Sequence, residues 1–280
     1  MTPPRLDEII RAVRDLPSLP VVVMELLETM EHDDANSIDL ANKISQDQAL
    51  AAKVLRLANS SFYGMSARVT TVPQAISILG FGTVRALVTA ASISGAFVLD
   101  PQSSFNFAQF WKHAIATAIC AKHIAVPHRI AADIAFVTGL LHDIGQLVLA
   151  TRFPQAYASV VEQCRASDCA VDVAERAVFD TDHATVGAAL AAHWRFPLAM
   201  QQAVALHHDD ALAGSDMLAS IIHVANAIAH ALDLAADPME AVPALAESAW
   251  LAVALDPASL ARILPRIEAE FQAISPILSA

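Results

Sequence analysis

Two adjacent residues, His142 and Asp143, could do chemistry because they lie within a strongly apolar stretch, residues 140–145 (LLHDIG). A buried imidazole and a buried carboxylate are unfavourable unless each has a partner. Neutral imidazole and carboxylate are also ligands that Mn, Fe, Zn and similar divalent ions accept. The pair therefore predicts either part of a metal site or a hydrogen-bonded pair that joins helices.

Other stretches of the chain supply candidates for the rest of such a site. All eleven histidines except His32 lie between residues 113 and 230. Two ligands do not make a metal site, so the others must come from different helices. The candidate ligands for a divalent transition metal (Mn, Fe or Zn) are His113, His142, Asp143, Asn226, His183, His207 and His208.

Several candidates also have a purely structural interpretation. His113 is either a ligand or a core partner of Asp143. His183 follows Thr181 and Asp182 at an expected helix start, where the interpretation that we prefer is helix capping. The residues alone leave a metal site and a hydrogen-bonded core both open.

A polar stripe crosses the apolar stretch 220–230, where His223, Asn226 and His230 fall at positions i, i+3 and i+7. These spacings place the three side chains on one helical face, so His223 is a further candidate beside Asn226. Of the neighbouring His207 and His208, we expect one to be exposed and the other to line a central cleft. Surface or satisfied core positions are expected for His123, His128, His193 and His230.

The elements that must position these residues are helices, because apolar residues recur every three to four positions almost throughout. The expected helices in the first part of the chain are 6–15, 21–30, 37–44, 49–57, 74–79 and 84–98. Those in the second part are 107–125, 131–150, 154–166, 171–179, 184–195, 198–208 and 217–234, with an Ala- and Leu-rich tail at 243–272. A linker at 100–104 predicts two lobes, residues 1–100 and 106–280.

Composition agrees with a compact helical protein. Of the 280 residues 55% are hydrophobic and 16% charged, which excludes a disordered chain. The net charge is −12, and no Lys or Arg lies between Arg195 and Arg262. A nucleic-acid binder needs basic residues to neutralise phosphates, so we predict no nucleic-acid partner.

The sequence also predicts a cytoplasmic protein without a membrane span. The chain opens MTPPRLDEII, with acids where a signal peptide would be apolar. The longest uncharged apolar run, 86–99, is shorter than the roughly 20 residues that a spanning helix needs. Cys120, Cys164 and Cys169 form no CxxC motif and are expected to be ordinary buried thiols.

Several segments together resemble a known family. In the first part these are 16–20 (LPSLP), 41–59 (ANKISQDQALAAKVLRLAN), 60–63 (SSFY) and 75–80 (AISILG). In the second part they are 110–113 (FWKH), 139–145 (GLLHDIG) and 182–188 (DHATVGA). With these motifs, over roughly residues 10–235, the chain resembles the HDOD family, which is related to the HD superfamily of metal-dependent phosphohydrolases.

The resemblance implies an all-α fold, with an N-terminal lobe of short helices packed on an HD-like helical lobe. HDOD proteins are bacterial signalling modules, often linked to motility, biofilm, stress or cyclic-dinucleotide pathways. Most are taken to act by binding partners, because their HD ligand set is incomplete. His183, His207 and His208 match histidines that the HD-GYP phosphodiesterases use for added metals.

Departures from the catalytic pattern bear on activity. Asn226 stands where catalytic HD enzymes end their ligand set with aspartate, and an amide brings no charge to a cation. HD-GYP enzymes carry a lysine where this chain has Gln146. Their glycine-tyrosine-proline loop is also absent, since residues 209–214 read DDALAG.

We therefore expect a stand-alone, non-catalytic signalling regulator, and we assign no catalytic residue. Its expected partners are signalling proteins, or a cyclic dinucleotide or other nucleotide. Residues 62–64 (FYG) either present aromatic side chains to such a partner or pack one lobe on the other, and the sequence leaves both open. The alternative is a metal-dependent phosphohydrolase or phosphodiesterase acting on a nucleotide. A third hypothesis is a sensor that binds an anionic messenger more tightly as its histidines charge below roughly pH 6.5.

Overall fold

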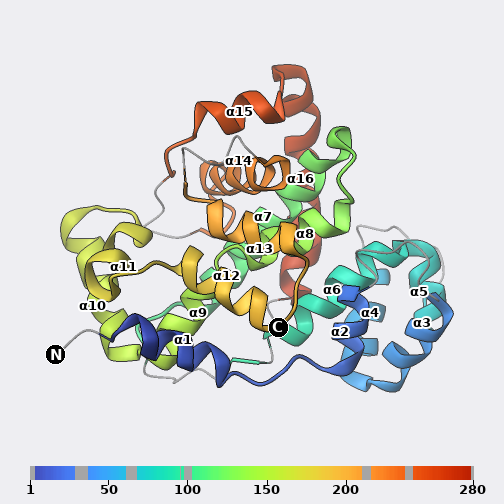
Figure 1. Ribbon diagram of the computed structural model, residues 1–280. Coiled ribbons are helices and arrows are strands. Elements are labelled where there is room, and N and C mark those ends of the chain that lie inside the picture. The colour runs from blue at the N-terminus through green and yellow to red at the C-terminus, as the bar shows by residue number, and fades with distance from the viewer. Residues whose placement is uncertain are drawn as a thin grey trace.

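A computed structural model describes residues 4–28, 37–60, 68–94, 96–97, 103–209, 216–236 and 242–278. Every regular element within these ranges is a helix (Figure 1). The all-α prediction is therefore confirmed. The candidate docking residues 62–64 and most of the expected linker lie outside the described residues.

Five short helices form a group at the lower right of Figure 1. Asp47 begins one of them by accepting hydrogen bonds from the backbone N–H groups of Ala49 and Leu50, as expected of an N-cap. Thr71 begins the next, and Gly80 ends it at φ 81°, a left-handed conformation that favours glycine. The five are α2 (Val21–Glu28), α3 (Ser37–Gln46), α4 (Gln48–Ala58), α5 (Val72–Leu79) and α6 (Phe81–Ser94).

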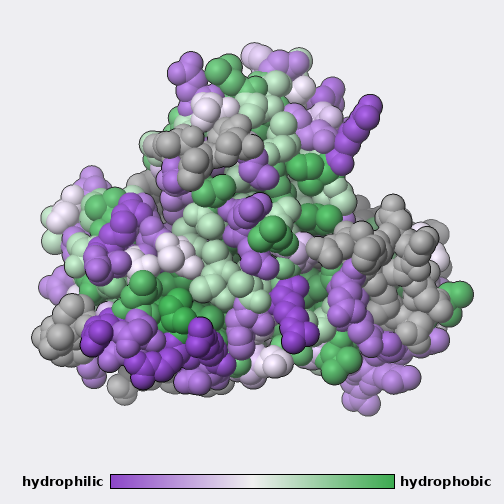
Figure 2. Space-filling model, in the orientation of Figure 1, coloured by the Kyte–Doolittle hydropathy of each residue, from purple (hydrophilic) through white to green (hydrophobic). Residues whose placement is uncertain are grey.

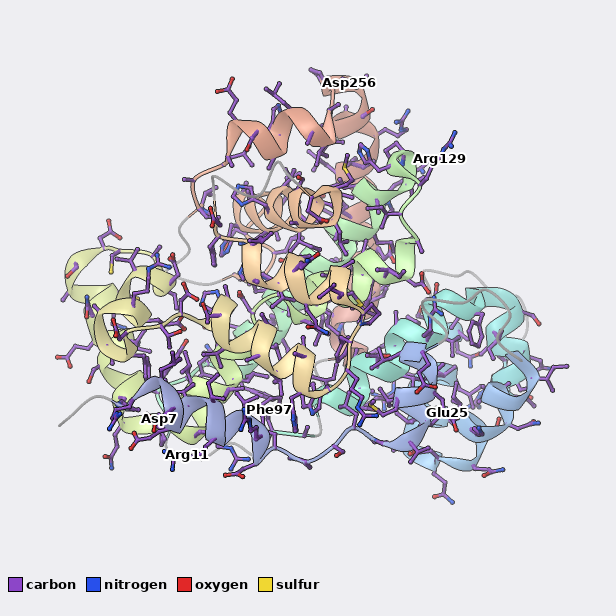
Figure 3. The ribbon with its side chains drawn as sticks, viewed as in Figure 1. Asp7, Arg11, Glu25, Phe97, Arg129 and Asp256 are labelled. Atoms are coloured by element: carbon purple, nitrogen blue, oxygen red, sulfur yellow. The ribbon has the colours of Figure 1, made fainter. Side chains whose placement is uncertain are left out.

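The first helix, α1 (Leu6–Arg14), lies apart from this group and packs against α9 (Ile144–Arg152) and α12 (His183–His193). Its exposed side is hydrophilic and carries Asp7 and Arg11 (Figures 2 and 3). The segment after it stays on α12, because the Trp194 Nε1–H donates to the Pro17 carbonyl at 3.1 Å. Phe97 meets the same indole edge-on, with ring centroids 6.2 Å apart (Figure 3). The expected lobe boundary near residue 100 stays a prediction.

The rest of the chain is built around α7 (Phe107–Ala125), which packs against α8 (Ala132–Leu141), α14 (Met217–Ala231) and α16 (Pro257–Leu278). Nearly every residue of α7 from 114 to 121 is buried. Around this centre lie η2 (Val126–His128), α10 (Pro154–Ser167), α11 (Val171–Phe179), α13 (Leu198–Leu206) and α15 (Glu247–Val253).

The prediction of a single helix over residues 131–150 is wrong in one respect. It is interrupted at His142 and Asp143, where α8 ends and α9 begins. Gly145 follows the interruption and allows close packing, because a Cβ atom there would lie 2.0 Å from the carbonyl oxygen of His183. The first turn of α9 therefore packs directly on the backbone of α12. The interruption brings His142 and Asp143 to one end of both helices.

Helix α16 joins the two parts of the molecule. It packs on α7 and also on α4 and α6. Glu270 is 2% exposed and accepts hydrogen bonds from Lys122 Nζ at 2.6 Å and from the His123 ring at 2.8 Å. A buried charged network thus fixes α16 on α7.

One stretch within the described residues, Ala132–Arg152, is long and apolar enough to cross a membrane by composition alone. In the structure 83% of its most apolar window is buried against other helices. A bent pair, α5 with nearly all of α6 (Phe81–Ile93), passes the same test but turns by 116°. Such burial is typical of core helices.

Candidate metal centre

The side chains of four helix ends and of the middle of α7 converge on the Asp143 carboxylate. Its Oδ1 lies 3.1 Å from the Nε2 atom of His183 and 3.3 Å from those of His142 and His207. Its Oδ2 lies 3.7 Å from Nε2 of His113. Asp143 therefore belongs to two groups of possible ligand atoms, one with His183, His207 and His208 and one with His113 and His142.

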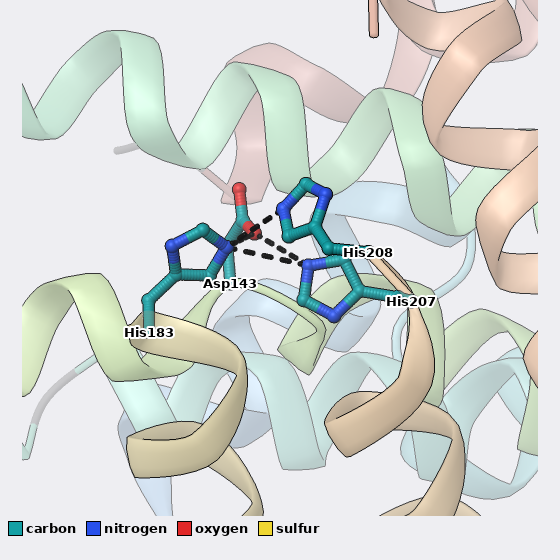
Figure 4. A group of neighbouring side chains, drawn as sticks. All are labelled: Asp143, His183, His207 and His208. Carbon is teal, nitrogen blue, oxygen red and sulfur yellow. Dashed lines mark hydrogen bonds and ion pairs between the residues drawn. The ribbon is translucent and has the colours of Figure 1, made fainter. Parts of the chain in front are cut away.

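Figure 4 shows the first of these groups. His183 is the first residue of α12, and His207 and His208 directly follow α13. Nε2 of His183 lies 3.3 Å from Nε2 of His207 and 3.0 Å from Nε2 of His208. The structure therefore places His207 and His208 together, with His207 fully buried and His208 half-buried. The expectation that one of them is exposed is wrong, because both rings turn toward the end of α12.

Hydrogen bonds to backbone carbonyl oxygens orient two of the rings in the cluster. Nδ1 of His142 lies 2.7 Å from the Gly139 carbonyl oxygen, and Nδ1 of His207 lies 2.7 Å from that of Val204. A carbonyl oxygen only accepts, so Nδ1 donates in both rings. In the neutral form of each ring, Nε2 then carries a lone pair that faces Asp143. This arrangement is typical of histidines that bind metals.

The electrostatics of the cluster favour neutral imidazoles around an ionised carboxylate. Burial lowers the pKa of His142 to about 4, despite the adjacent Asp143 carboxylate. Burial also lowers the pKa of His113 and of His208. Burial alone would raise the pKa of Asp143, but the imidazoles, first that of His142 and then that of His183, hold it well below its usual range.

His183 is the exception in this group. Burial would lower its pKa, but the carboxylates of Glu175 and Asp143 outweigh burial and raise it well above 6.5. The ring is therefore a positively charged imidazolium between the two carboxylates when no other cation lies there. A metal ion at this place would take over the role of that proton.

The donor set fits a divalent cation. Asp143 Oδ1 is buried, and three ring nitrogens lie within 3.3 Å of it. In their neutral forms the rings of His142 and His207 present Nε2 lone pairs to this oxygen, and lone pairs that face a carboxylate repel it unless a cation lies between them. Carboxylate and imidazole together suit Mn, Fe or Zn.

Asn226, on α14, lies beside His113 with its side chain 3% exposed. Its Oδ1 is buried and has no hydrogen-bond partner. An amide oxygen is a neutral donor, so this atom is available to the group that contains His113 and His142.

His223 has a structural role instead. Its Nδ1 donates to the His207 carbonyl oxygen at 2.9 Å, and its Nε2 accepts from the backbone N–H of Ala246 at 2.9 Å. Both ring nitrogens are therefore used, and His223 has no lone pair for a metal. His230, expected at the surface or in the core, is half-buried and stacks on His113, with ring centroids 4.2 Å apart.

Helix capping, the role preferred for His183 from the sequence, belongs to the preceding residue, Asp182. Asp182 is the N-cap of α12 and accepts from the backbone N–H of Thr185 at 2.9 Å, whereas the His183 side chain is 1% exposed and lies in the cluster. Sequence reasoning missed Glu175, on α11, which is fully buried against His183. No motif in the sequence marks it, since it lies eight residues before its partner in another helix.

Comparisons with known proteins agree with this fold. The profile of the HDOD domain matches residues 16–210. An uncharacterized protein of Treponema pallidum (strain Nichols) is 29% identical over 199 residues, which are 70% of this chain and 38% of that protein. The chain thus spans less than half the length of this relative.

Three solved structures are similar over almost the whole chain. One, from Shewanella amazonensis SB2B and provisionally named a phosphohydrolase, is 28% identical with a TM-score of 0.78, and 96% of this chain and 97% of that chain are covered. An HDOD domain protein of unknown function from Geobacter sulfurreducens is 21% identical with a TM-score of 0.74, covering 96% and 99%. A protein of Marinobacter aquaeolei VT8, provisionally named for signal transduction, is 23% identical with a TM-score of 0.80, covering 100% and 62%.

The last two structures show the fold alone, because their identities are low. The profile match is of a different kind, since it covers more than half of this chain and includes both groups of helices. It also spans most of the residues that converge on Asp143. The chain belongs to the HDOD domain family.

Proposed function

We propose that this protein is a signalling regulator whose histidine–aspartate cluster holds a divalent transition metal, Mn, Fe or Zn, for structure or switching. It acts by binding a signalling protein or a nucleotide messenger. Membership of the HDOD family supports an HD-related signalling role. The cluster supports the metal.

The observation that carries the proposal is the convergence of ring nitrogens on one buried carboxylate. Asp143, His183, His207 and His208 would hold one ion, and His113, His142 and Asp143, with Asn226, would hold another. An ion in the first group would tie α12 and the end of α13 to the junction of α8 and α9. When bound, such an ion supplies a Lewis acid that can polarise a phosphoryl oxygen or acidify water.

Two residues favour regulation over hydrolysis. Asn226 contributes no charge to its group, so a bound cation is held by fewer carboxylates and activates water less. Gln146 follows the cluster on α9, and its Oε1 accepts from the Tyr157 hydroxyl at 3.4 Å. Neither residue supplies a charged group to stabilise a reacting phosphate.

The first experiment measures the metal content of the purified, untagged protein by elemental mass spectrometry. We expect one or two transition-metal ions per chain, and none or fewer in Asp143→Ala. Asp15→Ala is the matched control, because Asp15 is an exposed aspartate at the end of α1. A wild-type protein that stays free of metal after incubation with Mn²⁺, Fe²⁺ or Zn²⁺ contradicts the proposal.

A second candidate function is a metal-dependent phosphohydrolase acting on a nucleotide. It is favoured by the Shewanella structure, which is 28% identical and provisionally named a phosphohydrolase. Each group contains one partly exposed ring, His208 in the first and His113, whose side chain is 12% exposed, in the second. Divalent-metal-dependent turnover of a cyclic dinucleotide that Asp143→Ala abolishes would establish this function.

A further inference from the structure

His183 is held on three sides. The backbone of α9 packs on its carbonyl at Gly145, where a Cβ atom would be 2.0 Å away. Glu175 Oε2 accepts a hydrogen bond from the His183 backbone N–H at 2.7 Å and one from its ring Nδ1–H at 2.6 Å. One carboxylate oxygen therefore fixes both the main chain and the ring.

Helix α11 is itself fastened to the start of α12. Arg176, the residue after Glu175, forms an ion pair with Asp182 at 2.7 Å and another with Asp172. Asp182 caps α12 immediately before His183. The Arg176–Asp182 ion pair thus links the helix that carries Glu175 to the start of α12, whereas the Arg176–Asp172 pair lies within α11 itself.

From these contacts we infer that Glu175 is the positioning residue of the metal centre: it sets the direction in which His183 presents Nε2 to the ion. The inference rests on the proposed function. A carboxylate that accepts from one ring nitrogen orients the imidazole and strengthens the other nitrogen as a ligand. The Nδ1 atoms of His142 and His207 contact backbone carbonyl oxygens instead of a carboxylate.

A purely structural role accounts less well for this residue. Glu175 is fully buried, and its second oxygen, Oε1, has no hydrogen-bond partner. If accepting from a backbone N–H were its only task, glutamine would do so without the cost of burying a charge. The charge is useful where the ring that it contacts faces a cation on its other side.

The test compares Glu175→Gln with the wild type. Glutamine keeps the size and one acceptor but removes the charge. We expect Zn²⁺ affinity, measured by competition with a chromophoric chelator, to fall about 10- to 100-fold. We also expect the ligand-field absorption of bound Co²⁺ to change, which altered folding stability alone would not produce. Glu162→Gln, at an exposed glutamate on α10, is the matched control.

Each outcome separates this inference from the proposed function. If the wild type binds neither Zn²⁺ nor Co²⁺, the result contradicts both the proposed metal centre and the role of Glu175. Wild type that binds Zn²⁺ while Glu175→Gln binds it equally well and gives the same Co²⁺ spectrum leaves the centre intact and overturns the role of Glu175 alone.

A second variant covers the case in which Glu175→Gln melts early. Glu175→Asp keeps the charge but withdraws the carboxylate by one methylene, so we expect a loss of affinity smaller than that of Glu175→Gln. Circular dichroism of both variants without metal checks that their helices are formed. A folded Glu175→Asp protein with a larger loss than the glutamine variant contradicts the assigned role of the charge.

Discussion

At the scale of single residues, neighbouring histidines in this cluster have different tasks. His207 presents a ring nitrogen to Asp143, whereas both ring nitrogens of His223 form hydrogen bonds with backbone groups. The difference is set by what each Nδ1 and Nε2 contacts and not by residue type or burial. It can be tested by separating loss of stability from loss of metal.

We expect His223→Ala to destabilise the protein without removing the metal. The variant leaves the His207 carbonyl and the Ala246 N–H without partners and opens a cavity, so the free energy of unfolding should fall by about 2–4 kcal/mol. Chelator-treated protein unfolded in urea measures this loss, with His193→Ala, at an exposed site, as control. Loss of bound metal equal to that in Asp143→Ala would show instead that His223 is a ligand.

Asn226 is the residue at which regulation and catalysis are best distinguished. Asn226→Asp adds a carboxylate to the group of His113 and His142, which should strengthen the binding of a divalent ion there. We expect tighter metal binding and metal-dependent hydrolysis of a nucleotide phosphodiester that the parent lacks. Equal turnover by parent and variant would argue that position 226 does not limit activity.

At the scale of helices, the junction of α8 and α9 decides whether a cluster can form. A straight helix through residues 132–152 would direct His142 and Asp143 about 100° apart. The junction instead lies against the start of α12, and Gly145 permits that approach. Apolar periodicity continues across the junction, so the sequence pattern alone predicts one helix.

We expect Gly145→Ala to separate α9 from α12. Its new methyl group would collide with backbone, which cannot rotate away, so destabilisation should reach about 3 kcal/mol, at the upper end for overpacked cores. Thermal melting and metal content together measure the effect. Ala192→Ser adds one heavy atom at an exposed position of α12 and should change stability by less than about 0.5 kcal/mol. A Gly145→Ala protein with wild-type melting and metal content would contradict this account.

Much of this architecture and part of the site could be predicted from the sequence. The helical periodicity and the HDOD motifs identify the fold, and the predicted ligands lie together. Glu175 could not be predicted, because its contact with His183 depends on how α11 turns into α12 at Asp180, which has φ 56°. The role of His223 likewise depends on Ala246, a contact that no local spacing reveals.

At the scale of the whole molecule, α16 packs both on the short helices α4 and α6 and on α7, which carries part of the cluster. Glu270 is its buried anchor. Burial would raise the Glu270 pKa, but the hydrogen bond from His123 and the charge of Lys122 hold it below its ordinary value of 4.5. A folded-state pKa below that of the unfolded chain means that the carboxylate stabilises the fold above about pH 4.5, and that this stabilisation is lost as the pH falls.

We expect Glu270→Gln to lower the free energy of unfolding by about 1.5–3 kcal/mol at pH 7, because it removes the charge from one hydrogen bond and the acceptor from the other. The difference in the free energy of unfolding between wild type and variant should become smaller as the pH falls below about 4.5, where the wild-type carboxylate takes up its proton. Urea unfolding at pH 7, 5 and 4 measures it, with the exposed Glu268→Gln as control. A gap that is constant over this range would exclude the charge as its source.

The position of α16 also has a consequence for the order of events on the ribosome. Helix α4 is synthesised about 200 residues before α16, which packs on it. At roughly 5–20 residues per second, the surface of α4 that α16 covers stays bare for on the order of ten seconds or more. During that interval the nascent chain exposes an apolar face that chaperones can bind, and only synthesis of α16 closes it.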